Sequence, residues 1–191
     1  MSCSLFEIGL WNSVFSEEQI KEINKTVLNV AEPIDEFGGL THAASNARKT
    51  SIVTRFQMET LRNEIYKKIS SVVIETNKLK FGYDLFPITE YDYLNYNVYN
   101  KGDEYEWHTD GQNDGDFDIK LTCLINLSES PYEGGELMLG INQGKGFGAE
   151  IEGFVPGSVL IFSPHVYHRV TPVTEGRRIS ATLWALGPKF R

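Results

Sequence analysis

The sequence has few cysteines, no long apolar run and little basic charge, and each shortage excludes a class of protein. Its 191 residues contain two cysteines, Cys3 and Cys123. Two cysteines cannot form the disulfide framework of a small secreted domain, so a reducing compartment is expected. No apolar stretch approaches the roughly 18 residues of a membrane span, and no secretory signal pattern is present. We expect a cytoplasmic protein without a membrane partner.

Basic charge is scarce relative to acidic charge. The chain carries 18 lysine and arginine residues against 26 aspartate and glutamate residues, a formal net charge of -8. This balance argues against the broad basic surface that nucleic-acid binding requires, and it favours a basic substrate. The hydrophobic fraction of 41% is typical of a globular protein, and the length suits one domain over residues 1–191. We expect a monomer with no nucleic-acid partner.

The N-terminal part carries two helical patterns. Ser16-Glu17-Glu18-Gln19 is typical of a helix start with acidic residues in the first turn, and this predicts a helix that continues to about Leu28. A second helix is predicted over residues 59–79, where apolar residues recur at helical spacing. Residues 31–51 show no sustained period and predict a long loop. The helical support is therefore expected within about residues 15–80.

After residue 82 the pattern changes to short segments of β type separated by turns rich in glycine and acidic residues. The strands predicted there cover residues 88–99, 119–127, 135–139, 148–151, 158–162, 169–173 and 178–186, after an N-terminal strand at residues 5–11. Such a series without intervening helices indicates a barrel or jelly roll. The expected fold is mainly β with N-terminal helices: a double-stranded β-helix over about residues 86–187, braced by two helices.

A candidate metal site comes from three residues. His108 and Asp110 are two apart, and alternate side chains of an extended strand share a face, so both can bind one ion. A His-x-Asp pair alone occurs by chance in many proteins, but His168 supplies a third ligand. Two imidazoles and one carboxylate form the facial triad of non-haem Fe(II) oxygenases, which leaves positions open for co-substrate and oxygen. The constellation predicts a mononuclear iron site.

An arginine follows His168 ten residues later in the sequence. Residues 168–178 predict a strand, a turn and a second strand, which bring an arginine back beside His168. Arg178 is favoured over Arg177 because it shares one strand face with Thr182 and Trp184. A buried arginine needs an anion, and 2-oxoglutarate supplies a far carboxylate for a bidentate pair, to which Thr182 could donate a hydrogen bond. The alternative is that both arginines are solvated charges at a hairpin.

Several motifs occur in a family-specific order. They are Tyr99-x-x-Gly102-x-x-Tyr105-x-x-His108-x-Asp110, Tyr132-Glu133-Gly134-Gly135-Glu136-Leu137, Pro156-Gly157-Ser158 before an apolar strand, the segment from His168 to Arg178, and Trp184. Over residues 15–186 the chain resembles the prolyl 4-hydroxylase-like 2-oxoglutarate and Fe(II)-dependent oxygenases, which include collagen-type, hypoxia-sensing and PKHD-type members. The resemblance implies a double-stranded β-helix fold.

The resemblance also implies a set of ligands. Fe(II) would be bound by His108, Asp110 and His168, and 2-oxoglutarate by Arg178, with Tyr99 placing a hydroxyl near the co-substrate. Oxygen would be consumed, succinate and CO2 released, and ascorbate is a candidate reductant.

Two further positions bear on the ligands. Asn126 falls where hypoxia-sensing enzymes carry a co-substrate tyrosine, so this contact is either remade or missing. Arg48 lies in a segment that resembles the R-x-S segment of prolyl hydroxylases, and it is either a substrate contact or a surface charge.

The resemblance favours a prolyl residue in a peptide or protein as the substrate. A free amino acid or another small molecule is the alternative on the same site. A more distant alternative is a non-catalytic, cupin-like metal-binding module, which predicts that the triad or the arginine is missing. Trp107 adjoins the first metal ligand, but as its strand neighbour it should face the opposite side and pack.

Overall fold

The computed structural model describes residues 7–30, 47–110, 115–140 and 148–190, and in these residues two antiparallel sheets face one another. The larger sheet contains, in spatial order, β1 (Ile8–Trp11), β9 (Val159–Phe162), β5 (Phe117–Asn126), β12 (Arg178–Pro188), β3 (Tyr93–Tyr99) and β2 (Ile52–Gln57). The smaller sheet contains β4 (Tyr105–His108), β10 (Tyr167–Val170), β7 (Leu137–Gly140) and β8 (Gly148–Glu150). The strands β6 (Glu133–Gly134) and β11 (Val173–Glu175) pair separately.

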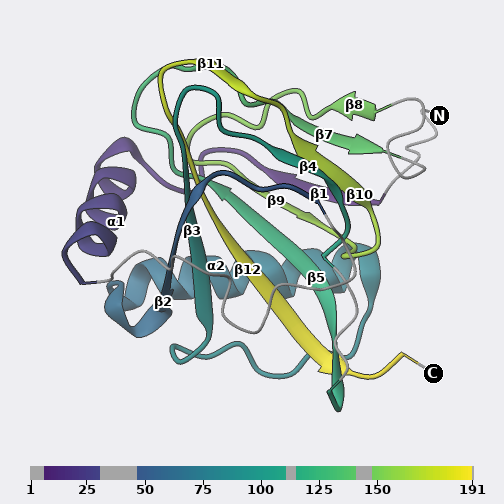
Figure 1. The fold of residues 1–191 in the computed structure, drawn as a ribbon. Helices are drawn as coiled ribbons and strands as arrows, with labels where there is room; N and C mark the ends of the chain where they lie inside the picture. The colour runs from purple at the N-terminus through teal and green to yellow at the C-terminus, as the bar shows by residue number, and fades with distance from the viewer. Residues whose placement is uncertain (1–6, 31–46, 111–114, 141–147, 191) are drawn as a thin grey trace.

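Two α-helices cover the outer face of the larger sheet (Figure 1). Helix α1 (Glu17–Val30) begins as predicted, because Ser16 and Gln19 exchange side-chain and backbone hydrogen bonds of 3.3 Å in a capping box. Helix α2 (Asn63–Thr76) follows a short 3-10 turn and lies across the sheet, and its last turn continues as a π-helix to Phe81. The described residues contain no helix long and apolar enough to cross a membrane.

Alternation along the strands divides the larger sheet into two chemical faces. On β12, Ile179, Ala181 and Leu183 belong to the core that packs against the helices. The alternate residues of the same strand point to the opposite side and line a cavity between the sheets. A second apolar cluster, which includes Leu160 and Phe162, fills the rest of the space between the sheets.

The predicted fold class is confirmed: helices precede and brace a double-stranded β-helix. Strand β2 was missed, although its first three residues are β-branched and Phe56 is aromatic. The strand predicted at residues 169–173 is two strands, because Pro172 has no N–H to donate and the pairing partner changes from β7 to β6. The second helix starts later than predicted, at Asn63.

Most of the loop predicted over residues 31–51 lies outside the described residues. Its last part is described and contains a β-bridge between Lys49 and Tyr105. This bridge joins the segment before β2 to β4 of the smaller sheet.

Candidate active site

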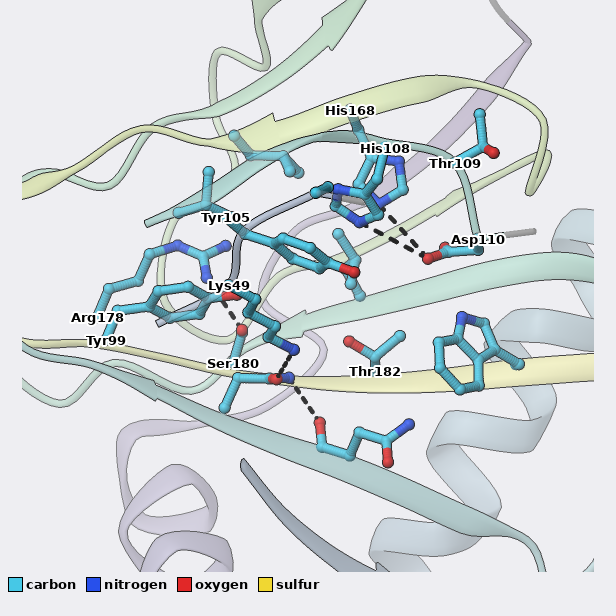
Figure 2. Close-up of a pocket in the computed structure, with 17 residues that line it drawn as sticks. Lys49, Tyr99, Tyr105, His108, Thr109, Asp110, His168, Arg178, Ser180 and Thr182 are labelled. Carbon is cyan, nitrogen blue, oxygen red and sulfur yellow. Dashed lines mark hydrogen bonds and ion pairs between the residues drawn. The ribbon is translucent and has the colours of Figure 1, made fainter. Parts of the chain in front are cut away.

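A cavity of about 240 Å³ lies between the two sheets, and Figure 2 shows the side chains that line it. The larger sheet contributes the inward faces of β3 and β12, and the smaller sheet contributes β4 and β10. Part of the wall is apolar and consists of Leu124, Leu137 and Val170. The predicted metal ligands and the predicted anion-binding arginine all face this space.

The three predicted metal ligands come together on the smaller-sheet side of the cavity. His108 and His168 are directly opposite one another in the β4–β10 pair, and Asp110 follows two residues after β4 ends. The Asp110 Oδ1 atom lies 3.9 Å from His108 Nε2 and 3.7 Å from His168 Nε2. One ligand atom from each residue lies within 4.8 Å of the other two, and all three residues are buried.

Neighbouring groups orient the ligand atoms. The Nδ1 atoms of His108 and His168 lie 2.7 and 3.0 Å from the carbonyl oxygens of Glu106 and Val166. A carbonyl only accepts hydrogen bonds, so each Nδ1 carries a proton, and Nε2 is the ring nitrogen that faces Asp110. A donor set of two imidazole Nε2 atoms and one carboxylate suits Fe(II), with the cavity on the open side.

Aromatic rings pack against the two imidazoles. Tyr105 stacks on His108 with ring centroids 3.5 Å apart and an interplanar angle of 19°. Phe162 meets His168 edge-on at 5.0 Å. Burial raises the pKa of Tyr105, with Asp110 and Tyr99 adding to the shift, so its hydroxyl stays protonated. The ligands are thus held in place by packing as well as by hydrogen bonds.

Arg178 supplies a buried cation to the cavity. Its side chain is 2% exposed, its guanidinium donates a 3.0 Å hydrogen bond to Ser180, and it lies 5.2 Å from the centre of the Tyr99 ring. Among the described residues no carboxylate forms an ion pair with it. The parity argument for Arg178 agrees with the structure, since Ser180, Thr182 and Trp184 line the cavity with it.

Tyr99 and Thr182 both face the cavity, as the sequence indicated. Tyr99 is directly opposite Arg178 in the pairing of β3 with β12, which places ring and guanidinium side by side. Burial raises the pKa of Tyr99 despite the opposing effect of Arg178, so its hydroxyl can donate a hydrogen bond at neutral pH.

Two other predicted residues do not reach this cavity. The side chain of Arg48 is 63% exposed and pairs with Glu104 and Glu106, so the structure places it on the surface. Asn126 uses its amide to bind the Phe154 carbonyl at 2.9 Å and the Ser128 N–H at 3.1 Å, and it lines a separate cavity. Arg178 and Leu137 line both cavities.

The structure adds residues that the sequence analysis missed. Lys49, Asn95 and Asn97 line the cavity, and Figure 2 labels Lys49. The two asparagines share the strand face of Tyr99 at intervals of two, and this alternation was a usable signal. Lys49 comes from a segment without a regular pattern, so only its position next to Arg48 hinted that one of the pair could face inward.

The comparisons with known proteins agree with this geometry. Residues 94–186 match the family model of the 2OG-Fe(II) oxygenase superfamily. A PKHD-type hydroxylase of Janthinobacterium sp. (strain Marseille) is 28% identical over 187 residues, which cover 90% of this chain and 74% of that protein. A PKHD-type hydroxylase of Shewanella oneidensis is 34% identical over 94 residues, which cover 47% of this chain. That alignment spans only 40% of the Shewanella protein.

Solved structures share the fold. A prolyl-4-hydroxylase of Pseudomonas putida superposes with a TM-score of 0.70 at 16% identity, covering 97% of this chain and 95% of that chain. At this identity the similarity establishes the fold and not the chemistry. The match to the family model and the PKHD-type relatives support assignment of the chain to the 2OG-Fe(II) oxygenases, and the solved prolyl-4-hydroxylase structure supports the fold.

Proposed function

We propose that the protein is an Fe(II)- and 2-oxoglutarate-dependent dioxygenase that hydroxylates an unactivated C–H bond and releases succinate and CO2. One observation carries the proposal: a single cavity holds the buried His108, Asp110 and His168 group together with a buried arginine that no described carboxylate neutralises. These are the two attachment points that a chelating 2-oxo dicarboxylate requires.

The arginine argues for an anionic ligand on energetic grounds. Burying a charge without a partner costs several kcal/mol, so an ion pair with Arg178 must come from outside the described residues. The planar guanidinium matches a carboxylate in a bidentate pair, and the Tyr99 hydroxyl can add a hydrogen bond. The far carboxylate of 2-oxoglutarate fits this position while its 2-oxo acid end points to the triad.

Bound Fe(II) and the protein side chains would have different roles in the reaction. Bound Fe(II) supplies the activation of oxygen, which no side chain provides. The chain holds the ligand atoms in place, anchors the co-substrate through Arg178 and excludes water from a cavity that is partly lined by apolar residues. Ascorbate is proposed as a reductant that restores the metal.

A prolyl residue in a peptide or protein is the favoured substrate. The support comes from relatives that are named PKHD-type hydroxylases and from the fold shared with a prolyl-4-hydroxylase.

A free amino acid or another small molecule is the second candidate. Lys49, Asn95 and Asn97 form a polar part of the cavity wall that favours it, because such groups suit a small charged ligand. A non-catalytic module is disfavoured, because triad and arginine are both present.

The test is an anaerobic titration of Fe(II)-loaded protein with 2-oxoglutarate, followed through the weak visible charge-transfer band of a chelated 2-oxo acid. We expect the band in the wild type. Arg178→Ala should raise the titration midpoint at least tenfold, about 1.4 kcal/mol, while iron binding is retained. The exposed Arg177 provides the matched control, and Arg177→Ala should leave the midpoint unchanged.

Two results would contradict the proposal. Iron-loaded protein that shows no band binds a metal without this co-substrate, and an Arg178→Ala variant with an unchanged midpoint has its anion site elsewhere. Asp110→Ala should lose iron itself, because two ligands hold Fe(II) weakly. Once the band is established, succinate release in the presence of prolyl peptides or free L-proline distinguishes the two substrate classes.

A further inference from the structure

The cavity opens toward solvent at one end of β3 and β12. Tyr99 and Arg178, which are directly opposite one another, are 3% and 2% exposed. Asn95 and Thr182 form the opposite pair four residues away, and both are partly exposed. Tyr93, the next residue on this face of β3, is 45% exposed. The lining therefore leads from the buried Arg178 to a mouth beside Asn95 and Tyr93.

The edge strand β2 brings an arginine to this mouth. β2 is the outer strand beside β3 (Figure 1), and its Arg55 is directly opposite Asn95. Opposite residues of an antiparallel pair point to the same face of the sheet. The neighbours of Arg55 along the strand point the other way, and one of them, Phe56, belongs to the core that packs against the helices. Arg55 therefore lies on the cavity side of the sheet, next to a residue that lines the cavity.

An aromatic ring orients the Arg55 side chain. The guanidinium carbon Cζ lies 4.3 Å from the centre of the Tyr93 ring and over its face. A guanidinium at this distance is attracted to the ring, and the contact leaves its N–H groups available as donors. The ring thus holds a planar set of donors at the cavity mouth.

Arg55 has no acceptor in the part of the chain that the structure describes. The ion pairs found there involve Arg48, Arg62 and the two site histidines, and none includes Arg55. Its Nε atom is buried and makes no hydrogen bond to a described residue. A buried N–H without an acceptor is unfavourable, and a carboxylate matches the edge of a guanidinium in a bidentate pair.

The surrounding strand faces carry no acidic group. The residues of β2 and β3 on the cavity side are one cation with neutral neighbours: Val53, Arg55, Gln57, Tyr93, Asn95, Asn97 and Tyr99. An anion that approaches Arg55 over this part of the sheet therefore meets amide and aromatic groups, and no described carboxylate of these two faces repels it.

The size of the cavity decides which part of a substrate reaches Arg55. The volume of about 240 Å³ is below the roughly 300–1,000 Å³ of typical ligand cavities, and under the proposed function 2-oxoglutarate occupies part of it. Arg55 is not among the residues that line the cavity, so it meets only a part of the substrate that extends past the mouth. A free amino acid that enters the cavity ends inside it, whereas a peptide continues outward.

We infer that Arg55, held by Tyr93, is a substrate-binding position that receives the carboxylate of an acidic residue in a peptide substrate. The inference rests on the proposed function and narrows its substrate class to peptides or proteins with an acidic residue close to the reacting one. It reverses the expectation of a basic substrate, because the cavity mouth carries a cation although the chain as a whole is acidic.

The test measures peptide binding without turnover, in Fe(II)- and 2-oxoglutarate-loaded protein under anaerobic calorimetry. The probes are acetylated and amidated alanine peptides with a central proline, and each carries one glutamate at a different position before or after the proline. Every glutamate peptide has a glutamine counterpart, so each pair differs by one negative charge. We expect the wild type to bind at least one glutamate peptide about fivefold or more tightly than its counterpart, as a half-buried bidentate pair would provide.

Substitutions assign the preference to Arg55. Arg55→Met should reduce it to less than twofold, while the 2-oxoglutarate midpoint stays within twofold of the wild type. Tyr93→Leu should weaken the preference and Tyr93→Phe should retain it, because the ring and not the hydroxyl orients the guanidinium. Arg177 is exposed, and Arg177→Met is the matched control for loss of one arginine. Thermal unfolding checks the fold of each variant, and Arg55→Gln replaces Arg55→Met if the latter does not fold.

Three outcomes would overturn the inference. The wild type shows no preference for any glutamate peptide, which includes the case in which it binds no peptide; or the preference survives in the Arg55→Met variant; or that variant loses affinity for 2-oxoglutarate, which would assign Arg55 to the co-substrate. Failure of the proposed function is separate, because in that case the wild type does not bind 2-oxoglutarate at all.

Discussion

The hydroxyl of Thr122 on β5 donates a hydrogen bond to Oδ2 of Asp110, whose other oxygen, Oδ1, faces both site histidines. Thr122 is fully buried, so this bond selects which carboxylate oxygen is presented to the metal position. We predict that Thr122→Val lowers Fe(II) affinity by about 10- to 100-fold, the usual effect of removing such a partner. Anaerobic metal titration measures this, and an unchanged affinity would show that packing alone orients Asp110.

Gly135 lies against the Arg178 side chain and leaves the space that this side chain occupies. Its φ is +65°, and an added Cβ would lie 3.1 Å from Arg178 Cδ and 3.0 Å from Val173 Cγ2. We predict that Gly135→Ala displaces the arginine and raises the 2-oxoglutarate midpoint several-fold, besides destabilising the fold by about 1–3 kcal/mol. Gly82 is the matched control, since its φ is +66° and nothing lies within 4 Å of the added Cβ. Gly82→Ala should affect stability alone, and equal midpoints in both variants would contradict the prediction.

Lys49 should make stability depend on pH. Burial lowers the pKa of Lys49 from 10.5 to about 7; Asp110 opposes the shift and Arg178 adds to it. Between these values the unfolded chain holds a proton that the folded chain lacks, so the free energy of unfolding rises with pH above about 7. Below pH 7 the cost of burying the charge is complete.

Urea unfolding of the metal-free protein at pH 6, 7.5 and 9 tests this pH dependence. The wild type should gain stability relative to Lys49→Met as the pH rises, because only the wild type carries the lysine whose pKa is lowered in the fold. The nearby histidines, Asp110, Arg178, Tyr99 and Tyr105 are present in both proteins, so their effects on the free energy of unfolding cancel in the comparison. Parallel curves for the two proteins would show that Lys49 keeps its ordinary pKa in the fold.

Trp107 packs into a space that two glycines leave open, on the side of β4 away from the cavity. A Cβ at Gly140 would lie 2.8 Å from the indole, and one at Gly148 would lie 2.7 Å from it. We predict that Gly140→Ala destabilises the protein by about 1–3 kcal/mol through overcrowding. In a Trp107→Leu background the same change should cost less, and urea unfolding of the four proteins measures this coupling. Strict additivity would indicate that the indole moves away freely.

Local sequence patterns were enough to predict the fold class and the position of the site. The capping box at Ser16 marks the start of α1, and two-residue spacing brings His108 and Asp110 to one face of the chain. The same parity distinguished Arg178, which is buried, from Arg177, which is exposed. These features depend on neighbours within a few residues, so the sequence shows them directly.

Two positions depend on how far a residue lies along a strand and on which member of a pair points inward. Asn126 is at the end of β5, where its amide is used for the turn that contains Ser128. Arg48 and Lys49 differ by one position, and the bridge to Tyr105 decides between them. That bridge joins segments more than fifty residues apart, so no local pattern could reveal it. The metal and co-substrate roles stay predictions.

The two faces of β12 have a consequence for how this protein can change in evolution. Ile179 and Leu183 face the helices, while Arg178 and Thr182 face the cavity. Replacing one side chain alters one face and leaves the other intact. Inserting or deleting one residue instead exchanges the two sets downstream, driving polar groups into the helix interface and aliphatic groups into the cavity. Homologues that retain function should therefore differ in this strand by substitution and keep its length.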